Sequence, residues 1–492
     1  MPPWVLAKKK RIFALPAAGV LLAAILLLVS PAPTAAPPSP LLLAAAQELD
    51  NVRYDLVFQP ENHTLSVTME WDYQNRTGQA LTDIPLRLPA NAYKKEATSP
   101  AASPELIDLC YPGGFSPGGA TLHDAQWNAV PADTWLDPQD ETILWMRIPE
   151  LASQGKGTLR LRLVLDIPDC RHVFGRGEDV WMLGGVLPYP ARYGESGWQL
   201  RPLLPIGDAP QPELANYALS LSMPKGYACA APFAWQQEEG SANMLTGALP
   251  AGRDMGLVIY REAQVSRAMA GEVLVQSFAD TKANADKALG YAVKALAFFA
   301  RSYGDYPYPV FTLSMADMPF AGMEYSGIIM TGRGQYAAKD SLEVTIAHET
   351  AHQWFSVLVG SDSYTDAWQD EAVSEYASLR YIESVYGQAA FEQLVFLMAQ
   401  SPMRENIRPE ITPGSPLDRF YTMQEYSTVV YGRGLALMLA LDTDTDLHAF
   451  LRSYVEKYAF SFASREDFEA LLKETAGWDT APLMTDYLDT AI

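Results

Sequence analysis

The five residues HETAH at positions 348–352 constrain the fold of this chain more than any other stretch. They lie within residues 341–360, an apolar run that predicts one helix. Asp340 and Glu343 have the spacing of a capping box at its start, and Gly360 is typical of a helix end. The two histidines of this stretch are therefore expected on a single helix.

Histidines four residues apart lie on the same face of a helix, so His348 and His352 can direct two imidazole nitrogens at one metal ion. Glu349 lies beside that face, where it can take a proton from a water molecule near the metal. The same five-residue pattern also arises by chance, in a buried helix whose histidines only satisfy polar neighbours. A third ligand decides between these readings, because a catalytic zinc usually has three protein ligands.

A candidate for the third ligand lies in the next helical pattern, residues 366–387, where Glu371 is close to the start. The connection at residues 361–365 is short enough for the two helices to fold back as an antiparallel pair, with Glu371 opposite the histidines. We predict that His348, His352 and Glu371 hold one Zn²⁺ per chain.

The sequence around these ligands resembles a known family. Eighteen residues separate His352 from Glu371, with HETAHQWF around the histidines and WQDEAVSEY around the glutamate. This combination resembles the gluzincin aminopeptidases related to aminopeptidase N and leukotriene hydrolase. The resemblance implies an α+β multidomain fold, with an amino-terminal antiparallel β sandwich or saddle domain followed by a mainly α, thermolysin-like zinc catalytic domain.

Two further segments resemble motifs of that family. Gly322-Met323-Glu324-Tyr325 is similar to its exopeptidase motif GAMEN, whose glutamate holds the substrate's α-ammonium group, although Tyr325 replaces the usual asparagine. A strand edge there can also pair with a peptide backbone. Tyr431 resembles the family's tyrosine, whose phenol donates a hydrogen bond to the oxyanion of the reaction. Without this context, Glu324 is an ordinary turn carboxylate and Tyr431 a packing residue.

Apolar and polar residues alternate through much of residues 48–265, a pattern typical of strands with one buried face. Prolines and glycines separate these runs, which favours an antiparallel sheet or sandwich. The clearest run contains Leu65, Val67, Met69, Trp71 and Tyr73.

The amino terminus has the order of an export signal or an uncleaved membrane anchor. Four basic residues, 8–11, precede a run of eighteen mostly apolar residues, 12–29, and then a Pro/Ala/Ser spacer. The run is at the lower edge of the length that spans a bilayer, and we expect an anchor more than a cleaved signal. The basic side then stays in the cytoplasm, and the rest of the chain lies outside.

Charge excludes some partners. Beyond residue 47 the chain has 32 basic and 58 acidic residues, a formal charge of −26. Nucleic acid and anionic membrane surfaces, which are themselves negative, are therefore not expected to bind this part. Three cysteines do not make a disulfide framework, and at most one pair could form.

The sequence thus predicts a leader at residues 1–47, a β domain at 48–268 and a zinc metallopeptidase domain at 269–492. The expected activity is removal of amino-terminal residues from peptides with a free amino terminus, by a single-pass protein of the cell membrane or, otherwise, a secreted one. His348, His352 and Glu371 bind zinc, Glu349 and Tyr431 act in catalysis, and Gly322, Met323 and Glu324 bind substrate. The alternatives are a zinc endopeptidase with a more open cleft and a catalytically silent surface protein that contains zinc.

Overall fold

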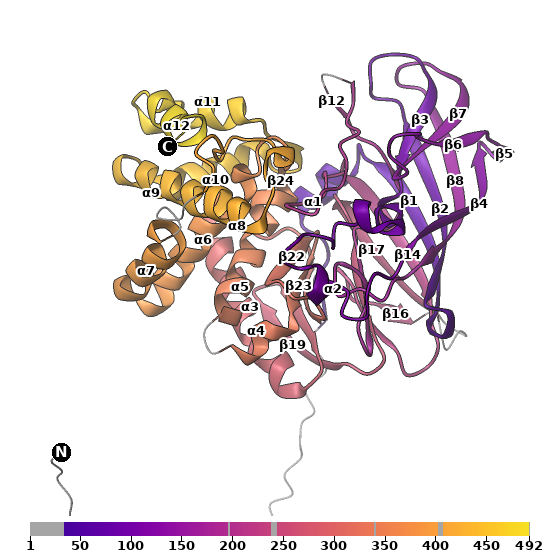
Figure 1. Ribbon diagram of the computed structural model, residues 1–492, viewed down its shortest axis with the longest axis horizontal. Helices are drawn as coiled ribbons and strands as arrows, with labels where there is room; N and C mark the ends of the chain where they lie inside the picture. The colour runs from indigo at the N-terminus through magenta and orange to yellow at the C-terminus, as the bar shows by residue number, and fades with distance from the viewer. Residues whose placement is uncertain (1–33, 195–196, 238–243, 339–340, 402–406, 492) are drawn as a thin grey trace, which may run out of the picture. The chain divides into compact units, whose positions relative to one another are not determined.

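The computed structural model describes residues 34–194, 197–237, 244–338, 341–401 and 407–491 (Figure 1). The apolar leader at residues 12–29 and Asp340, expected at the helix start, lie outside this part. Among the described helices, none is both long enough and apolar enough to cross a membrane.

The amino-terminal part of the described chain is built from β sheets. The largest has eight strands in the order β16-β17-β14-β1-β2-β8-β4-β5. Along β2, buried residues alternate with more exposed ones, as the sequence pattern predicts. The pairs are antiparallel except for β1 with β14, which run parallel. The strands are β1 (Asp50–Gln59), β2 (Thr64–Gln74), β4 (Gly119–Trp127), β5 (Val130–Pro131), β8 (Lys156–Asp166), β14 (Ala215–Ser222), β16 (Gln236–Gln237) and β17 (Met244–Gly252).

Smaller sheets and short helices complete this part. Two four-stranded sheets have the orders β15-β18-β10-β9 and β11-β3-β7-β6, and β12 pairs with β13. The strands are β3 (Leu81–Arg87), β6 (Thr134–Leu136), β7 (Ile143–Leu151), β9 (Phe174–Arg176), β10 (Val180–Gly184), β11 (Tyr189–Pro190), β12 (Tyr193–Gly194), β13 (Gly197–Trp198), β15 (Ala228–Ala230) and β18 (Gly256–Tyr260). The helices are α1 (Pro40–Ala46), η1 (Pro60–Asn62), η2 (Pro89–Lys94), η3 (Glu96–Thr98) and α2 (Ile107–Cys110).

A five-stranded mixed sheet follows, in the order β19-β20-β21-β23-β22. Strands β20, β21 and β23 run parallel, and β22 is an antiparallel strand at the edge. The helix α3 (Lys282–Tyr303) begins at Thr281, whose side chain accepts a hydrogen bond from the Asn284 amide, and packs on β19 and β20. The strands are β19 (Gln264–Ala270), β20 (Val273–Ala279), β21 (Val310–Ala316), β22 (Gly322–Tyr325) and β23 (Ile328–Gly332).

The remainder is mainly helical, and Figure 1 shows these helices in orange and yellow, together on one side of the β-rich part. The helices are α4 (Arg333–Ala337), α5 (Ser341–Ala351), η4 (Gln353–Leu358), α6 (Trp368–Tyr386), α7 (Gln388–Val395), η5 (Phe396–Gln400), η7 (Leu417–Arg419), α8 (Met423–Tyr426), η8 (Ser427–Arg433), α9 (Gly434–Asp444), α10 (Leu447–Tyr458), α11 (Arg465–Ala476) and α12 (Ala481–Leu488), and β24 (Val359–Gly360) pairs with β25 (Ser461–Phe462). The predicted fold class, a multi-sheet β part followed by a helical part, is confirmed.

The predicted single helix over residues 341–360 is wrong in its second half. The regular helix α5 ends at Ala351, and residues 353–358 continue as a π-helical segment with non-helical backbone angles at Phe355, φ −109° and ψ 40°. The Val357 amide donates to the His352 carbonyl over 2.9 Å, a bond across five residues. The chain then turns into β24 and not into a capped helix end.

A buried arginine explains why Gly360 is a glycine. The Arg253 side chain donates to the carbonyls of Val357, over 2.8 Å, and Leu358, over 3.3 Å. A β-carbon at Gly360 would lie 2.6 Å from the Arg253 guanidinium carbon, so a side chain cannot fit there. Arg253 lies in the connection between β17 and β18, and it therefore ties the β-rich part to the end of the histidine helix.

Candidate functional site

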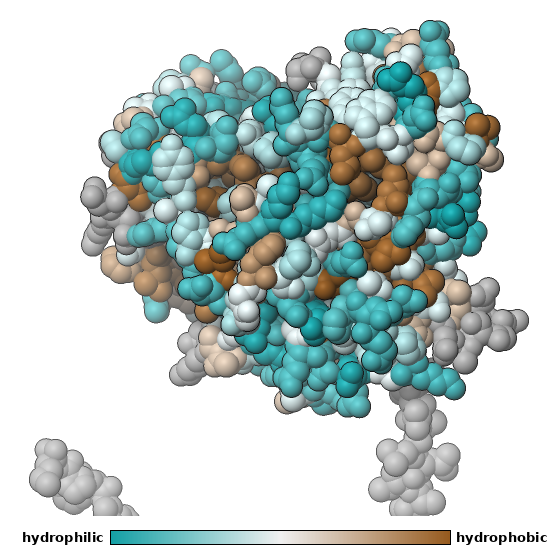
Figure 2. Space-filling view, turned by 45° about the vertical axis from the view of Figure 1, so that its right-hand side comes forward, coloured by the Kyte–Doolittle hydropathy of each residue, from teal (hydrophilic) through white to brown (hydrophobic). Residues whose placement is uncertain are grey.

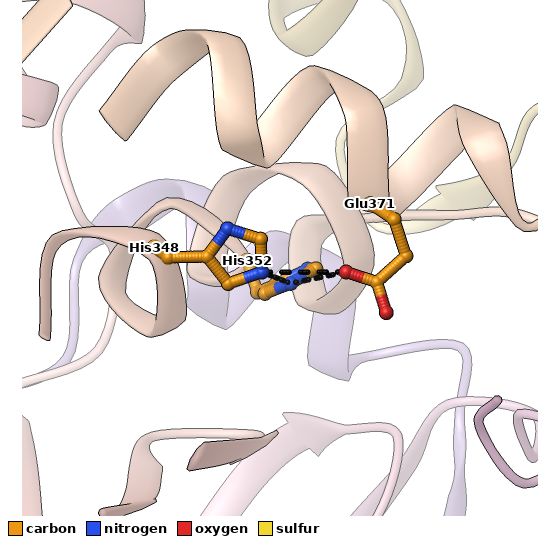
Figure 3. Close-up of side chains that lie close together, drawn as sticks. All are labelled: His348, His352 and Glu371. Carbon is orange, nitrogen blue, oxygen red and sulfur yellow. Dashed lines mark hydrogen bonds and ion pairs between the residues drawn. The ribbon is translucent and has the colours of Figure 1, made fainter. Parts of the chain in front are cut away.

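The structure brings His348, His352 and Glu371 together, as Figure 3 shows. The Nε2 atoms of the two histidines are 3.0 Å apart, and each lies 3.3 Å from Oε2 of Glu371. His348 lies on α5, His352 follows directly after the last residue of α5, and Glu371 lies in the first turn of α6; all three side chains are buried. Glu371, eighteen residues beyond His352 in the sequence, therefore forms one triangle of metal-ligand atoms with the two histidines.

The triangle has the dimensions that a zinc ion requires. A tetrahedral zinc with ligands at about 2.1 Å separates its donor atoms by about 3.4 Å, close to the distances found here. Two imidazoles and a carboxylate also form a common ligand set of catalytic zinc, which leaves one position for water or substrate. The residues present therefore fit a zinc ion.

The charge state of Glu371 suits a metal ligand. Burial alone raises the pKa of its carboxyl group, but the hydrogen bonds from His348 and His352 outweigh burial and lower that pKa. The side chain is therefore a carboxylate at neutral pH, which is the form that binds a cation.

Two residues that sequence reasoning missed contact the outer nitrogens of the histidines. Oε2 of Glu375 lies 2.8 Å from Nδ1 of His348, and the Ser374 hydroxyl lies 3.1 Å from Nδ1 of His352. Such contacts fix the ring orientation and the tautomer of a metal-binding histidine. Both residues follow Glu371 on α6, three and four positions later, so their helical spacing is the signal that could have found them.

Glu349 lies over a glycine of the edge strand β22. A β-carbon at Gly322 would lie 2.3 Å from Oε1 of Glu349, so only glycine leaves room for this carboxyl group. Oxygens of Glu324 and Glu349 and a nitrogen of His352 all lie within 4.8 Å of one another. Burial raises the pKa of Glu349 to about 7, against the opposing effect of the two histidines. The pKa of this group thus lies near neutrality, where a general base is effective.

Glu324 lies on β22 beside Glu349, and Oε1 of Glu324 accepts a hydrogen bond from the Ser356 hydroxyl over 3.3 Å. The Ser356 hydroxyl in turn accepts from the Gln211 amide over 2.8 Å. Side chains alternate along a strand, so Met323 and Tyr325 belong to the opposite face, where both pack in a separate hydrophobic cluster. Of the predicted substrate-binding residues, Gly322 and Glu324 therefore share the face of Glu349; Met323 lies on the other face of the strand but also lines the cavity.

Tyr431 also lies at the metal triangle. Its ring stacks on the His348 ring, with centroids 5.8 Å apart and planes inclined by 29°. Burial, with a smaller effect of the Glu371 charge, raises its pKa well above the ordinary value, so the phenol keeps its proton and can donate a hydrogen bond. It belongs to the π-helical segment η8, which sequence patterns did not predict.

A cavity of about 450 Å³ is lined by His348, Glu349, Glu371, Glu324 and Tyr431. Asp208, to which the sequence analysis gave no role, adds a further carboxyl group to it, and burial with the nearby Glu324 and Glu371 raises its pKa. Apolar side chains, among them Leu106 and Phe320, line another part of the cavity. In the space-filling view, hydrophobic surface gathers in the middle of the visible face between hydrophilic regions (Figure 2). The cavity thus combines an acidic, metal-binding part with an apolar part.

Comparison with known proteins agrees with this geometry. Residues 287–487 match the model of the Peptidase family M1 domain. Among curated proteins, the chain is 28% identical over 255 residues to Aminopeptidase M1-C of Oryza sativa subsp. japonica, covering 47% of this chain and 28% of that one. It is 26% identical over 402 residues to Aminopeptidase M1-A of the same plant, covering 75% of this chain and 44% of that one.

A bacterial relative is Aminopeptidase N of Lactococcus lactis subsp. lactis, 27% identical over 227 residues, covering 42% of this chain and 26% of that one. The matches thus span less than half the length of these relatives. Among solved structures, the M1 zinc metallopeptidase of Deinococcus radiodurans has the same fold, with a TM-score of 0.63 and 16% identity, covering 90% of this chain and 95% of that one. A mutant of that protein bound to a Tyr-Ser-Ala substrate gives a TM-score of 0.62 at 18% identity, covering 91% and 96%.

The matched residues contain all three predicted metal ligands, the edge strand with Glu324, and Tyr431. Residues 287–487 therefore resemble a peptidase family M1 domain. The resemblance inferred from the residues around the ligands is confirmed by this match.

We predict that Glu375→Gln weakens zinc binding by about 10- to 100-fold, because His348 loses a charged partner at Nδ1. Competition with a chromophoric chelator measures this affinity directly. The matched control is Glu392→Gln, an exposed residue on α7 outside the site, which should leave zinc affinity unchanged. Equal affinities of the two variants would contradict the role of Glu375.

We predict that Gly322→Ala lowers peptidase activity while the protein stays folded and binds zinc. The three atoms nearest to the new methyl group all belong to the Glu349 side chain, so the carboxyl group moves and general-base catalysis, typically worth about 10²- to 10⁴-fold, is lost. Peptide hydrolysis and zinc content are measured together. Gly334→Ala in α4, where a β-carbon meets no atom within 4 Å, is the control, and full activity of the Gly322 variant would refute the close approach.

Proposed function

We propose that this protein is a zinc-dependent metallopeptidase, and that it acts as an aminopeptidase on peptides with a free amino terminus. The observation that carries the proposal is the triangle of His348, His352 and Glu371, which meets a cavity that Glu349 also lines. The M1 domain match and the names of the relatives support the same reaction class.

Each residue then has a task that its position supports. His348, His352 and Glu371 hold the zinc, which when bound lowers the pKa of a water molecule and polarises the peptide carbonyl. Glu349 takes the proton from the attacking water and passes it to the leaving amine. Tyr431, protonated and stacked on His348, donates a hydrogen bond to the oxyanion.

The amino terminus of the peptide is the second feature that the cavity can recognise. An ammonium group is attracted by carboxylates, and Glu324, which is partly exposed, has an oxygen within 4.8 Å of ligand atoms of Glu349 and His352, close to the metal triangle. A peptide held there by its first nitrogen has its first carbonyl next to the metal, which fixes the bond that is cut. The Deinococcus radiodurans mutant bound to a Tyr-Ser-Ala substrate supports a peptide as the ligand.

Two alternatives follow from the same residues. A zinc endopeptidase would use the metal and Glu349 but would not need Glu324. A catalytically silent protein would keep the zinc and would leave Glu349 without a task. The group of acidic side chains around the metal favours the aminopeptidase.

The location of the protein is also a proposal. The basic and apolar leader supports a single-pass protein of the cell membrane with the peptidase part outside, or otherwise a secreted protein. Separating membranes from soluble material after expression of the full chain tests it, and recovery of all protein in the cytoplasmic fraction would contradict it.

We predict that Glu349→Gln retains zinc but loses peptide hydrolysis by about 10²- to 10⁴-fold, because the amide cannot accept the proton. Elemental analysis and turnover of aminoacyl reporter substrates measure the two properties. Zinc-loaded wild-type protein that turns over no peptide across a broad library would favour the silent protein instead.

We predict that the wild-type protein cleaves free peptides and not their N-acetylated counterparts. Glu324→Gln should raise KM for free peptides by about 10- to 100-fold, the value of a hydrogen bond between charged groups. Glu178→Gln, an exposed residue of the β-rich part, is the control. Equal cleavage of free and acetylated peptides would identify an endopeptidase.

A further inference from the structure

A second, much smaller cavity of about 20 Å³ is lined by three arginines, Arg87, Arg192 and Arg201. The loop that connects the two zinc helices, Ser361 to Ser363, forms part of its wall. Arginines so close together repel one another unless an anion or acidic side chains lie between them. This group is unexpected in a chain with a formal net charge of −22.

Arg87 is the central observation. It lies at the end of β3 and is only 2% exposed, yet none of its three guanidinium nitrogens has a hydrogen-bond partner among the described residues. The neutral Tyr189 phenol lies near Arg87, whose charge opposes the rise in the pKa of that phenol caused by burial, but the phenol donates its own proton to the Pro210 carbonyl at 3.4 Å. A buried cation without partners is very unfavourable, so Arg87 requires a counter-charge that the described residues do not supply.

The other two arginines are held in place by aromatic rings. The Arg192 guanidinium carbon lies 4.0 Å from the centre of the Phe462 ring, and that of Arg201 lies 4.6 Å from the centre of the Tyr364 ring. Stacking occupies the flat face of a guanidinium and leaves the N–H groups at its edge available. Both arginines are therefore preorganised donors at this cavity.

A hydroxyl group and a carboxylate are among the remaining lining residues. The buried Ser361 hydroxyl has no partner among the described residues and can donate. Asp362 is the single acidic residue of the lining, and its Oδ2 lies 3.9 Å from the nearest Arg192 nitrogen, too far for a hydrogen bond. One carboxylate thus faces three guanidinium groups, and the lining keeps a net positive charge.

We propose that this cavity is a binding site for one small inorganic anion of the size of chloride. A volume of about 20 Å³ exceeds the roughly 10 to 15 Å³ that a single water needs, but it excludes a whole phosphate group or a peptide. Water could fill the space but could not neutralise Arg87. An anion would both neutralise it and accept hydrogen bonds from the three arginines and Ser361.

The anion site is linked to the candidate substrate anchor by one side chain. Gln211 lines both cavities and donates to the Ser356 hydroxyl, which donates to Glu324. Oε1 of Gln211 has no partner among the described residues. An anion that orders this loop therefore also orders the contact that positions Glu324.

The test uses the zinc-loaded full chain, and its zinc content is measured in each salt so that an effect of halide on the zinc is recognised. Thermal unfolding is followed while sodium gluconate, whose anion is too large for the cavity, is replaced by sodium chloride or bromide at constant ionic strength. We expect the melting temperature to rise by about 2 °C or more in either halide. We also expect an anomalous bromide peak among the three arginines in crystals grown with bromide.

Variants make the assignment specific. Arg87→Met and Arg201→Met should each remove the halide effect on the melting temperature, and Arg201 provides the test if the buried Arg87 variant fails to fold. Arg267→Met on β19, an exposed residue away from the cavity, should keep the effect. Equal melting temperatures of the wild type in gluconate and halide, with no bromide peak, would overturn the proposal, as would an unchanged halide effect in the Arg201 variant.

A kinetic consequence rests on the proposed function. If Glu324 holds the amino terminus, halide should lower KM for free peptides and leave kcat nearly unchanged. In Arg201→Met, halide should change neither KM nor kcat. The melting experiment does not depend on peptide hydrolysis, so a halide-stabilised but inactive protein would refute the proposed function alone. A halide-stabilised, active protein with an unchanged KM would refute only the link through Gln211.

Discussion

The packing of α5 against α6 is the constraint on which the rest of the site depends. It places Glu371 within 3.3 Å of both histidine nitrogens and sets Glu375 and Ser374 behind the two rings. These polar groups are buried, and Glu349 and Glu324 add more carboxyl groups nearby. Like charges so close together destabilise a folded chain unless a cation lies among them. This cluster of carboxyl groups destabilises the folded chain without metal and is stabilised when zinc binds. Zinc binding and folding are therefore coupled.

Irregular helices, and not regular ones, position two of the side chains around that cluster. Ser356, which donates to Glu324, lies in the π-helical segment η4, and Tyr431 lies in a second one, η8. A π-helical turn rotates the following residues relative to a regular helix, and such turns are frequent at functional sites. Arg253 stabilises the first of these segments by donating hydrogen bonds to two of its carbonyls. The β-rich part, which contains Arg253, therefore helps to define the geometry of the helical part.

Sequence patterns predicted the metal ligands because their chemistry has a fixed helical spacing, and the β-rich part because its strands alternate. They missed features set by contacts between distant segments. Asp208 lies in a loop without periodicity, and the unpartnered state of Arg87 depends on strands and loops far apart in the chain. The sequence pattern assigned Gly360 to a helix end, but a glycine is required there because Arg253 approaches the backbone closely. Local patterns carry information on local geometry, and packing between segments must be seen in the structure.

The tyrosine at position 325 shows how packing changes the meaning of a departure from a motif. Because side chains alternate on β22, Tyr325 lies on the face opposite Glu324. There its ring is 6% exposed and lies against two glycines of the β-rich part, since a β-carbon would fall 2.2 Å from its hydroxyl at Gly184 and 2.7 Å from its ring at Gly256. The larger residue is thus accommodated by the absence of side chains on its neighbours, and Glu324 keeps its place beside Glu349. The replacement of asparagine by tyrosine is therefore no argument against recognition of an amino terminus.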